Sequence, residues 1–392
     1  MTASDRDAEY WSAWFWSEFF PDWLGKAQDG DWGVFDALDA DGNSDPTATK
    51  SILAQARTLF MVSHVALLSR DAQLLEVADK LASFLKCFRK APGLYRCAID
   101  REGNPTGLPA DEMARSYDQT FVILGLVTWN QLSPSPENEQ LIEECWEALQ
   151  TQLTDTKTGL LLNNDVGNDL NPAQNPHMHL FEACLQGYRM TKDSKWLTRA
   201  ADLRAIGLKH FFDQDTGSLA EFIQPDLSPL VGRDGLRREV GHQCEWAWLL
   251  LEEAQLADDP SLEVEARRLF EFADRFGYST TAPLVGAAYD AISAQGDVME
   301  SNSLLWPQTE AIKALALLHV SGEADAGQRA CSLMCLMFEA WFKGRPIYVN
   351  QLDTSGDAVW SEALTRLMYH VVLAMTEGAR AGLWSDVADN RG

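Results

Sequence analysis

Apolar residues recur at the spacing i, i+3, i+4 and i+7 along most of the chain. This period predicts helices and not strands. It is found near residues 5–25, 49–70, 71–90, 111–132, 136–154, 177–192, 194–213, 240–257, 260–278, 304–320, 323–343 and 358–378. The hydrophobic pattern therefore predicts an all-α chain with twelve helices.

The connections between these helices alternate in length. Short polar turns (LSRDA, NQLSPSPEN, MTKDS, ADDPS and SGEAD) join pairs of helices as antiparallel hairpins. The return connections are long, at 26–48, 91–110, 155–176, 214–239, 279–303 and 344–357. Two of them predict short strands beside a turn, in GLYRCAIDREGNP and TGSLAEFI. Long loops usually carry function. Five of these six lead into the first helix of a hairpin, and the sixth leads into the last predicted helix.

One polar or aromatic residue recurs at nearly constant intervals in or just before the helices that follow the long loops. These marked residues are Arg57, Tyr117, His179, His242, Trp306 and His370, with gaps of 60, 62, 63, 64 and 64 residues. Six such repeats without a linker predict a closed ring of helix pairs. We expect an (α/α)6 barrel, one domain over residues 1–392. The marked helices should lie inside, and the long loops should form a cleft at one mouth.

Composition and charge limit the classes of partner. A net charge of −26 argues against nucleic acid and anionic membranes, because both repel such a surface. No uncharged apolar run approaches the ~18–20 residues of a membrane span, and the acidic, aromatic N-terminus does not resemble a signal peptide. The seven cysteines contain no CxxC pair and mostly lie in apolar helices, as free thiols do. We expect a cytoplasmic protein, monomeric or homodimeric.

Three of the seven histidines, His179, His242 and His370, are marked residues. A single histidine on an apolar helix is usually a core residue, but three at one phase of a repeat favour a shared site. Imidazoles titrate near neutral pH and suit proton transfer. Glu245 follows His242 by one helical turn, so we expect its carboxylate to accept a ring N–H and orient that imidazole.

The other candidate residues suit a sugar. Arg57 is a lone cation in an apolar helix, and its fork of donors suits sugar oxygens or a developing enolate. Tyr117 and Trp306 are either core aromatics or stacking surfaces for a pyranose ring, and the Glu310 carboxylate can accept sugar hydroxyls. An HxH pair ends at His179, but no HExxH or cysteine ligand set accompanies it. We therefore expect no metal and no cofactor.

Six segments resemble the N-acylglucosamine 2-epimerase superfamily, in that family's order and near its spacing. They are QAR at 55–57, SYDQTF at 116–121, NPHMHLFEA at 175–183, GHQCEW at 241–246, WPQTE at 306–310 and LMYH at 367–370. The superfamily includes cellobiose and mannose 2-epimerases and isomerases of mannose or sulfoquinovose. Its known fold is an (α/α)6 barrel, which agrees with the fold that the repeat predicts.

The resemblance implies a role for each candidate. His242 and His370 look like the general acid and base, with Glu245 orienting His242. His179 looks like the residue that assists ring opening. The remaining positions look like residues that contact the substrate: Arg57 at its reacting end, and Asn175, Tyr117, Trp306 and Glu310.

The predicted function is a cofactor-free aldose–ketose isomerase of a monosaccharide, with D-mannose and D-fructose preferred and D-lyxose as a related aldose. A histidine removes the C2 proton, Arg57 stabilises the enediolate, and the same base returns the proton to C1. The alternative is a sugar 2-epimerase of the mannose/glucose, N-acylglucosamine or cellobiose type. There a second histidine returns the proton to the opposite face of C2.

Three further alternatives stay open. Arg233, Arg237 and Arg238, in the loop before the second marked histidine, leave room for a phosphorylated sugar. A glycoside hydrolase needs two facing carboxylates roughly 5–9.5 Å apart, for which Asp165 and Asp169 are the candidates. A non-catalytic sugar-binding protein would keep the aromatic residues and would not need the histidines.

Overall fold

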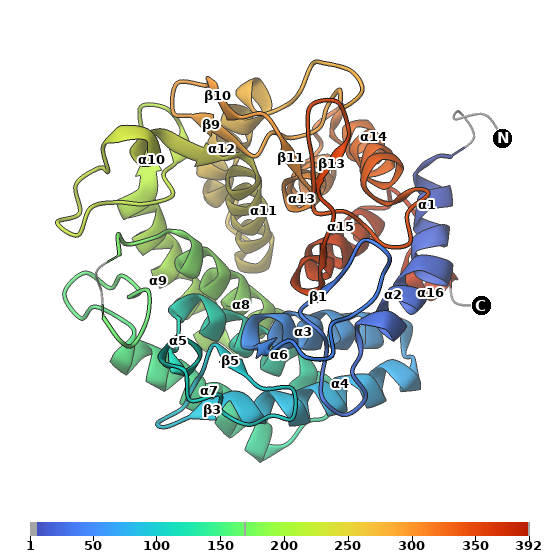
Figure 1. Cartoon of the computed structure of the whole chain (residues 1–392). Helices are drawn as coiled ribbons and strands as arrows, with labels where there is room; N and C mark the ends of the chain where they lie inside the picture. Colours follow the sequence, from blue (N-terminus) through green and yellow to red (C-terminus); the bar gives the residue numbers. More distant parts are fainter. Residues whose placement is uncertain (1–5, 168–169, 391–392) are drawn as a thin grey trace.

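The computed structural model describes residues 6–167 and 170–390, in which two concentric rings of helices surround one axis (Figure 1). The inner ring consists of α3 (Ile52–Ser69), α6 (Ser116–Leu132), α8 (Asn175–Thr191), α11 (Val240–Ala257), α13 (Leu305–Val320) and α15 (Met368–Arg380). The outer ring consists of α1 (Ala8–Trp14) continuing through a π-turn into α2 (Phe20–Ala27), then α4 (Ala72–Leu85), α7 (Pro136–Gln152), α9 (Ser194–Phe211), α12 (Glu263–Phe276) and α14 (Ala326–Met337). The predicted (α/α)6 barrel is confirmed.

Burial explains the two kinds of helix. The outer helix α12 buries only one stripe, which includes Ala266, Leu269 and Ala273, as expected for a helix with one solvated face. The inner helix α3 is buried on nearly all sides. Its length and its mean hydropathy of 1.4 would also fit a membrane span, and 78% of it is enclosed within the protein. The ring therefore accounts for the apolar character of α3.

The long return connections carry small antiparallel ladders and short helical turns. Four ladders have two strands: β1 (Ala37–Leu38) with β14 (Ala363–Leu364), β2 (Lys50–Ser51) with β5 (Ala98–Ile99), β3 (Arg89–Lys90) with β4 (Leu94–Tyr95), and β6 (Phe212–Asp213) with β7 (Ser218–Leu219). Two have three strands: β9 (Ala291–Ser293) lies between β8 (Arg237–Glu239) and β10 (Val298–Glu300), and β12 (Gln351–Leu352) lies between β11 (Ser303–Leu304) and β13 (Ala358–Trp360). The short helices are α5 (Pro109–Glu112), α10 (Gly232–Leu236) and α16 (Val387–Asn390). The β1–β14 pair joins the first return connection to the last and so closes the ring of loops.

Buried glutamines fasten the return connections to the inner helices. Gln55 on α3 accepts a hydrogen bond from Val34 N and donates to Val34 O, at 2.9 and 2.8 Å. The same pair of bonds joins an inner-helix glutamine to a loop backbone in three other repeats: Gln119 to Tyr95, Gln243 to Leu219 and Gln308 to Ala288. In the α8 repeat His177 accepts from Leu161 N at 2.9 Å. These bonds fix each loop beside the marked residue of its helix.

Candidate active site

A cavity of about 500 Å³ opens among the return connections at the end of the inner ring where the marked residues lie. All six marked residues line it, as do Asn175 and Glu245. The ninth predicted site residue, Glu310, is fully buried and contacts His370. The structure therefore brings the nine predicted residues to one place, although they span more than 300 positions of the chain.

His370 is placed as a neutral imidazole. Its Nδ1 lies 2.8 Å from a carboxylate oxygen of Glu310, and its Nε2 lies 3.2 Å from Nη1 of Arg57. Because a guanidinium only donates, Nε2 must accept and the ring hydrogen must sit on Nδ1. Burial, and then the charge of Arg57, hold the pKa of His370 well below its usual range. At neutral pH this residue is a base with a lone pair on Nε2.

His242 has the opposite environment. Its Nδ1 lies 2.7 Å from a carboxylate oxygen of Glu221 and 3.2 Å from one of Glu239. Burial alone would lower the pKa of His242, but these two carboxylates outweigh it and raise that pKa to about 10. His242 is therefore an imidazolium at neutral pH, and Nε2 is the nitrogen left for a ligand.

The carboxylate that orients His242 is Glu221, so the predicted role of Glu245 was wrong. Glu221 is held by Gln174 Nε2 at 3.1 Å and by the backbone N–H of Glu239 at 3.0 Å. Neither carboxyl oxygen of Glu245 has a hydrogen-bond partner among the described residues. The helical spacing of three residues was correct, but it places Glu245 toward α8 and not toward His242.

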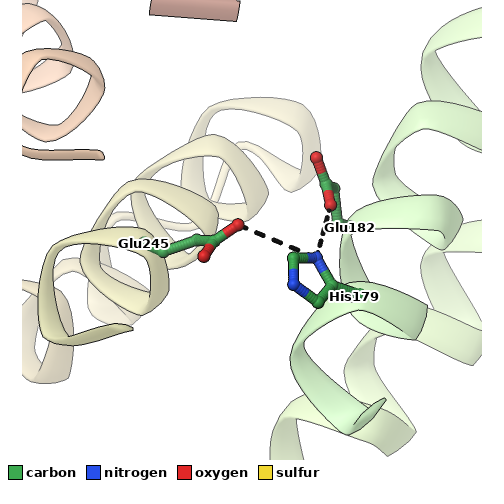
Figure 2. Close-up of side chains that lie close together, drawn as sticks. All are labelled: His179, Glu182 and Glu245. Carbon is green, nitrogen blue, oxygen red and sulfur yellow. Dashed lines mark hydrogen bonds and ion pairs between the residues drawn. The ribbon is translucent and has the colours of Figure 1, made fainter. Parts of the chain in front are cut away.

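His179 faces two carboxyl groups (Figure 2). Its Nδ1 lies 2.9 Å from an oxygen of Glu182, on the same helix, and 3.7 Å from an oxygen of Glu245, on α11. Glu182 also accepts a hydrogen bond from the hydroxyl of Tyr369. Burial is the main cause that raises the pKa of Glu182 to about 7 and lowers the pKa of His179 well below its usual range.

A lysine compensates the buried carboxyl groups below the cavity. Nζ of Lys313 lies 2.6 Å from Glu310, and both side chains are fully buried. The same ammonium group lies 3.7 Å from the ring centroid of Trp248. Burial opposes its charge, but Glu310, Glu245 and Glu182 together raise the pKa of Lys313. Lys313 therefore stays charged and supports Glu310, which in turn holds His370.

Arg57 is fixed at the base of the cavity. Its Nη2 donates to the hydroxyl of Tyr117 at 2.6 Å, and its guanidinium lies over the rings of Phe121 and Tyr369 at 4.0 and 4.7 Å. Its Nε is buried without a hydrogen-bond partner. The guanidinium is therefore held in place beside the neutral His370, with one unsatisfied N–H.

Trp306 lies close to both His242 and His370. The centroid of its indole lies 4.9 Å from that of His242 and 5.9 Å from that of His370. The indole packs against Gly241, where a Cβ would overlap its ring. A glycine at this helical position thus allows the indole to approach α11 closely.

Gly241→Ala is expected to displace Trp306 and so disturb both histidines. Overpacking of this kind costs ~1–3 kcal/mol of stability, and a misplaced substrate contact can cost up to ~10²-fold in rate. Melting temperature and kcat/KM should both fall. Gly25→Ala is the control, because Gly25 lies in α2 with no atom within 4 Å of its added Cβ. If the two variants behave alike, Trp306 is not held by this contact.

Several sequence candidates lie outside the cavity. Arg233 and Arg237 pair with Glu300, and Arg238 is buried against Ser218, so none of the three lines the cavity. Asp165 is bound by Lys90 and by the backbone of Ala114. Asp169 lies outside the described residues.

The residues of the site that escaped the sequence analysis include Glu182, Glu221, Glu239 and Lys313. Lys313 carried a signal, because a lone lysine in the apolar run AIKALALLHV is comparable to the lone arginine at 57. Glu221 and Glu239 carried none, because both lie in the long connection before α11: Glu221 in an irregular part, and Glu239 at the end of β8, a strand of three residues that is too short to show a period.

Three groups of side chains have the spacing of metal ligands, with donor atoms within 4.8 Å of one another. They are His179 with Glu182 and Glu245, Glu221 with Glu239 and His242, and Glu245 with Glu310 and His370. In each group one hydrogen bond joins the imidazole to a carboxylate: His179 to Glu182, His242 to Glu221 and His370 to Glu310. Glu245, which belongs to two of the groups, has no such bond among the described residues.

Known proteins with similar sequences include sugar isomerases and epimerases. The sequence profile of the N-acylglucosamine 2-epimerase family matches residues 33–374. The chain is 26% identical to a mannose-6-phosphate isomerase of Rhizobium meliloti, over 93% of this chain and 95% of that protein. It is 25% identical to a D-mannose isomerase of Marinomonas mediterranea, over 73% and 74% of the two chains. The fold superposes on a cellobiose 2-epimerase of Spirochaeta thermophila with a TM-score of 0.81 at 20% identity, covering 95% and 96%.

Proposed function

Since the chain belongs to the N-acylglucosamine 2-epimerase family, we propose that it is an aldose–ketose isomerase that interconverts D-mannose and D-fructose. The coarser statement follows from the family: the chain is a carbohydrate isomerase or epimerase. Two observations support an isomerase that acts on mannose: the names of the relatives and the protonation states of His242 and His370.

The observation that carries the proposal is the difference in protonation between two histidines of one cavity. His370 is a neutral base beside Arg57, and His242 is an imidazolium beside two carboxylates. Groups whose environments push their pKa values apart are suited to act as base and acid. His242 protonates the ring oxygen as the sugar opens. His370 then takes the C2 proton and returns it to C1, while Arg57 stabilises the enediolate.

The two carboxylates beside His242 favour isomerisation over 2-epimerisation. An epimerase that works in both directions needs each histidine to take a proton from carbon in turn. The carboxylates of Glu221 and Glu239 keep His242 protonated, which suits an acid that serves oxygen and disfavours a carbon base. Of His242 and His370, His370 is then the one that can take a proton from C2, and a single base suffices for transfer between C1 and C2.

The cations of the cavity favour a sugar without phosphate. Three arginines line the cavity. Arg115 is bound to Asp118 by two hydrogen bonds, and Arg57 is bound to Tyr117 and His370, so among the described residues Arg366 is the one cavity arginine whose guanidinium makes no hydrogen bond or ion pair. Phosphate sites usually hold the group with several free cations or a helix N-terminus. We therefore propose the free monosaccharide as substrate, with no cofactor. The seven free cysteines support a cytoplasmic location.

Proton NMR of the purified protein with D-mannose in D₂O tests the function. We expect fructose to appear, with the former C2 hydrogen or solvent deuterium at C1. Glucose as the only product would establish an epimerase and contradict the proposal. A parallel sample with mannose 6-phosphate tests the substrate, and faster turnover of the phosphorylated sugar would contradict the choice of the free one.

A further inference from the structure

Glu245 has an unusual position for a carboxyl group. It lines the cavity, its side chain is 1% exposed, and neither of its oxygens has a hydrogen-bond partner among the described residues. Figure 2 shows it reaching from α11 toward His179 on α8, at a distance of 3.7 Å, which exceeds a hydrogen bond. Buried polar groups are normally satisfied, so two buried carboxyl oxygens without a partner, on a residue that lines the cavity, point to a ligand as the missing partner.

Glu245 is also close to the base. Its carboxyl oxygen, an oxygen of Glu310 and a ring nitrogen of His370 lie within 4.8 Å of one another. Burial, and then the neighbouring Glu310, raise the pKa of Glu245 well above its usual range. This shift in pKa favours the protonated carboxyl group, in which one oxygen donates and the other accepts.

Isomerisation of an aldose to a ketose moves two hydrogens. One passes from C2 to C1, which His370 performs in the proposed function. The other passes from O2 to O1, and none of the residues described so far performs that transfer. A single group that donates to O1 and accepts from O2 would complete the reaction.

We propose that Glu245 transfers the hydroxyl proton from O2 to O1, an inference that rests on the proposed isomerase function. After His370 has taken the C2 proton, the O–H of Glu245 gives its proton to O1 of the enediolate. The other carboxyl oxygen takes the hydrogen of O2. As C2=O2 forms, C1 takes the proton from His370. Both side chains return to their starting protonation states.

The other buried carboxyl groups are committed to protein partners. Glu182 is bound to His179 and Tyr369, and Glu310 is bound to His370 and Lys313. Glu221 is bound to His242, Gln174 and the backbone of Glu239. Among these groups Glu245 is the one that has both oxygens free.

Glu245→Gln tests this role, because glutamine keeps the shape and cannot pass a proton. With mannose in D₂O we expect fructose formation to fall by at least ~10²-fold, the usual cost of losing a proton-transfer group. Exchange at C2 through His370 should fall far less, so the ratio of exchange to conversion should rise at least about tenfold. Glu253→Gln, on the same helix and paired with Arg204 away from the cavity, is the control and should leave both rates unchanged.

A second variant separates chemistry from structure. Glu245→Ala should be inactive and should regain fructose formation with added formate, a small carboxylic acid, but not with formamide. Equal loss of exchange and conversion in Glu245→Gln would overturn the proposal, since it would show a structural role. So would conversion above about a third of the wild-type rate. If the wild type yields only glucose, the proposed function itself fails, because epimerisation needs no transfer from O2 to O1.

Discussion

Replacing His370 by alanine is expected to abolish nearly all isomerase activity. Loss of a positioned general base typically costs ~10²–10⁴-fold in rate, and His370 is the neutral imidazole beside Arg57 in the cavity. The loss should appear in kcat at saturating mannose, because Arg57 and the aromatic walls that bind the sugar remain. The protein should still fold, since Glu310 keeps its ion pair with Lys313.

The control for His370→Ala is a buried histidine outside the cavity. His64 on α3 bonds to Thr376 at 3.1 Å and does not line the cavity. His64→Ala should therefore keep wild-type kcat even if its melting temperature falls. If His370→Ala retains more than about a tenth of wild-type kcat, another group removes the C2 proton, and the assignment of His370 fails.

His242→Ala is expected to show the second large effect, again ~10²–10⁴-fold in kcat, because the imidazolium that protonates the ring oxygen is lost. Glu221→Gln should affect the same step by changing the pH at which His242 loses its proton. His242 is protonated below its pKa, which Glu221 and Glu239 raise to about 10 against the effect of burial. Wild-type activity should therefore hold up to alkaline pH and fall as the pH rises through that value.

In Glu221→Gln the pKa of His242 should move down, because one of the two carboxylates that stabilise the imidazolium has become neutral. The alkaline limb of the kcat/KM profile should then lie at lower pH, while activity near neutral pH falls less than in His242→Ala. Glu253→Gln again serves as the control and should keep the wild-type limb. An unshifted limb in Glu221→Gln would show that His242 is not the acid that limits the reaction.

The sequence by itself determined the fold and the location of the site. A helix has a fixed period, so apolar residues at i, i+3 and i+4 identify helices without knowledge of their neighbours. A repeat near 63 residues then determined how the helices pair, and the phase of Arg57, His179, His242 and His370 determined which residues meet. These properties depend only on order and spacing along the chain.

The partners of those residues were decided by the tertiary structure. At 3.6 residues per turn, residues three apart point about 60° away from each other. That difference turns His242 toward Glu221 and Glu245 toward His179. Glu221 lies in an irregular connection, and its contact with His242 depends on where Gln174 and the Glu239 backbone hold it. The pattern along the chain shows which residues share one face of a helix. Which side chain contacts that face depends on how the separate helices and loops pack against each other.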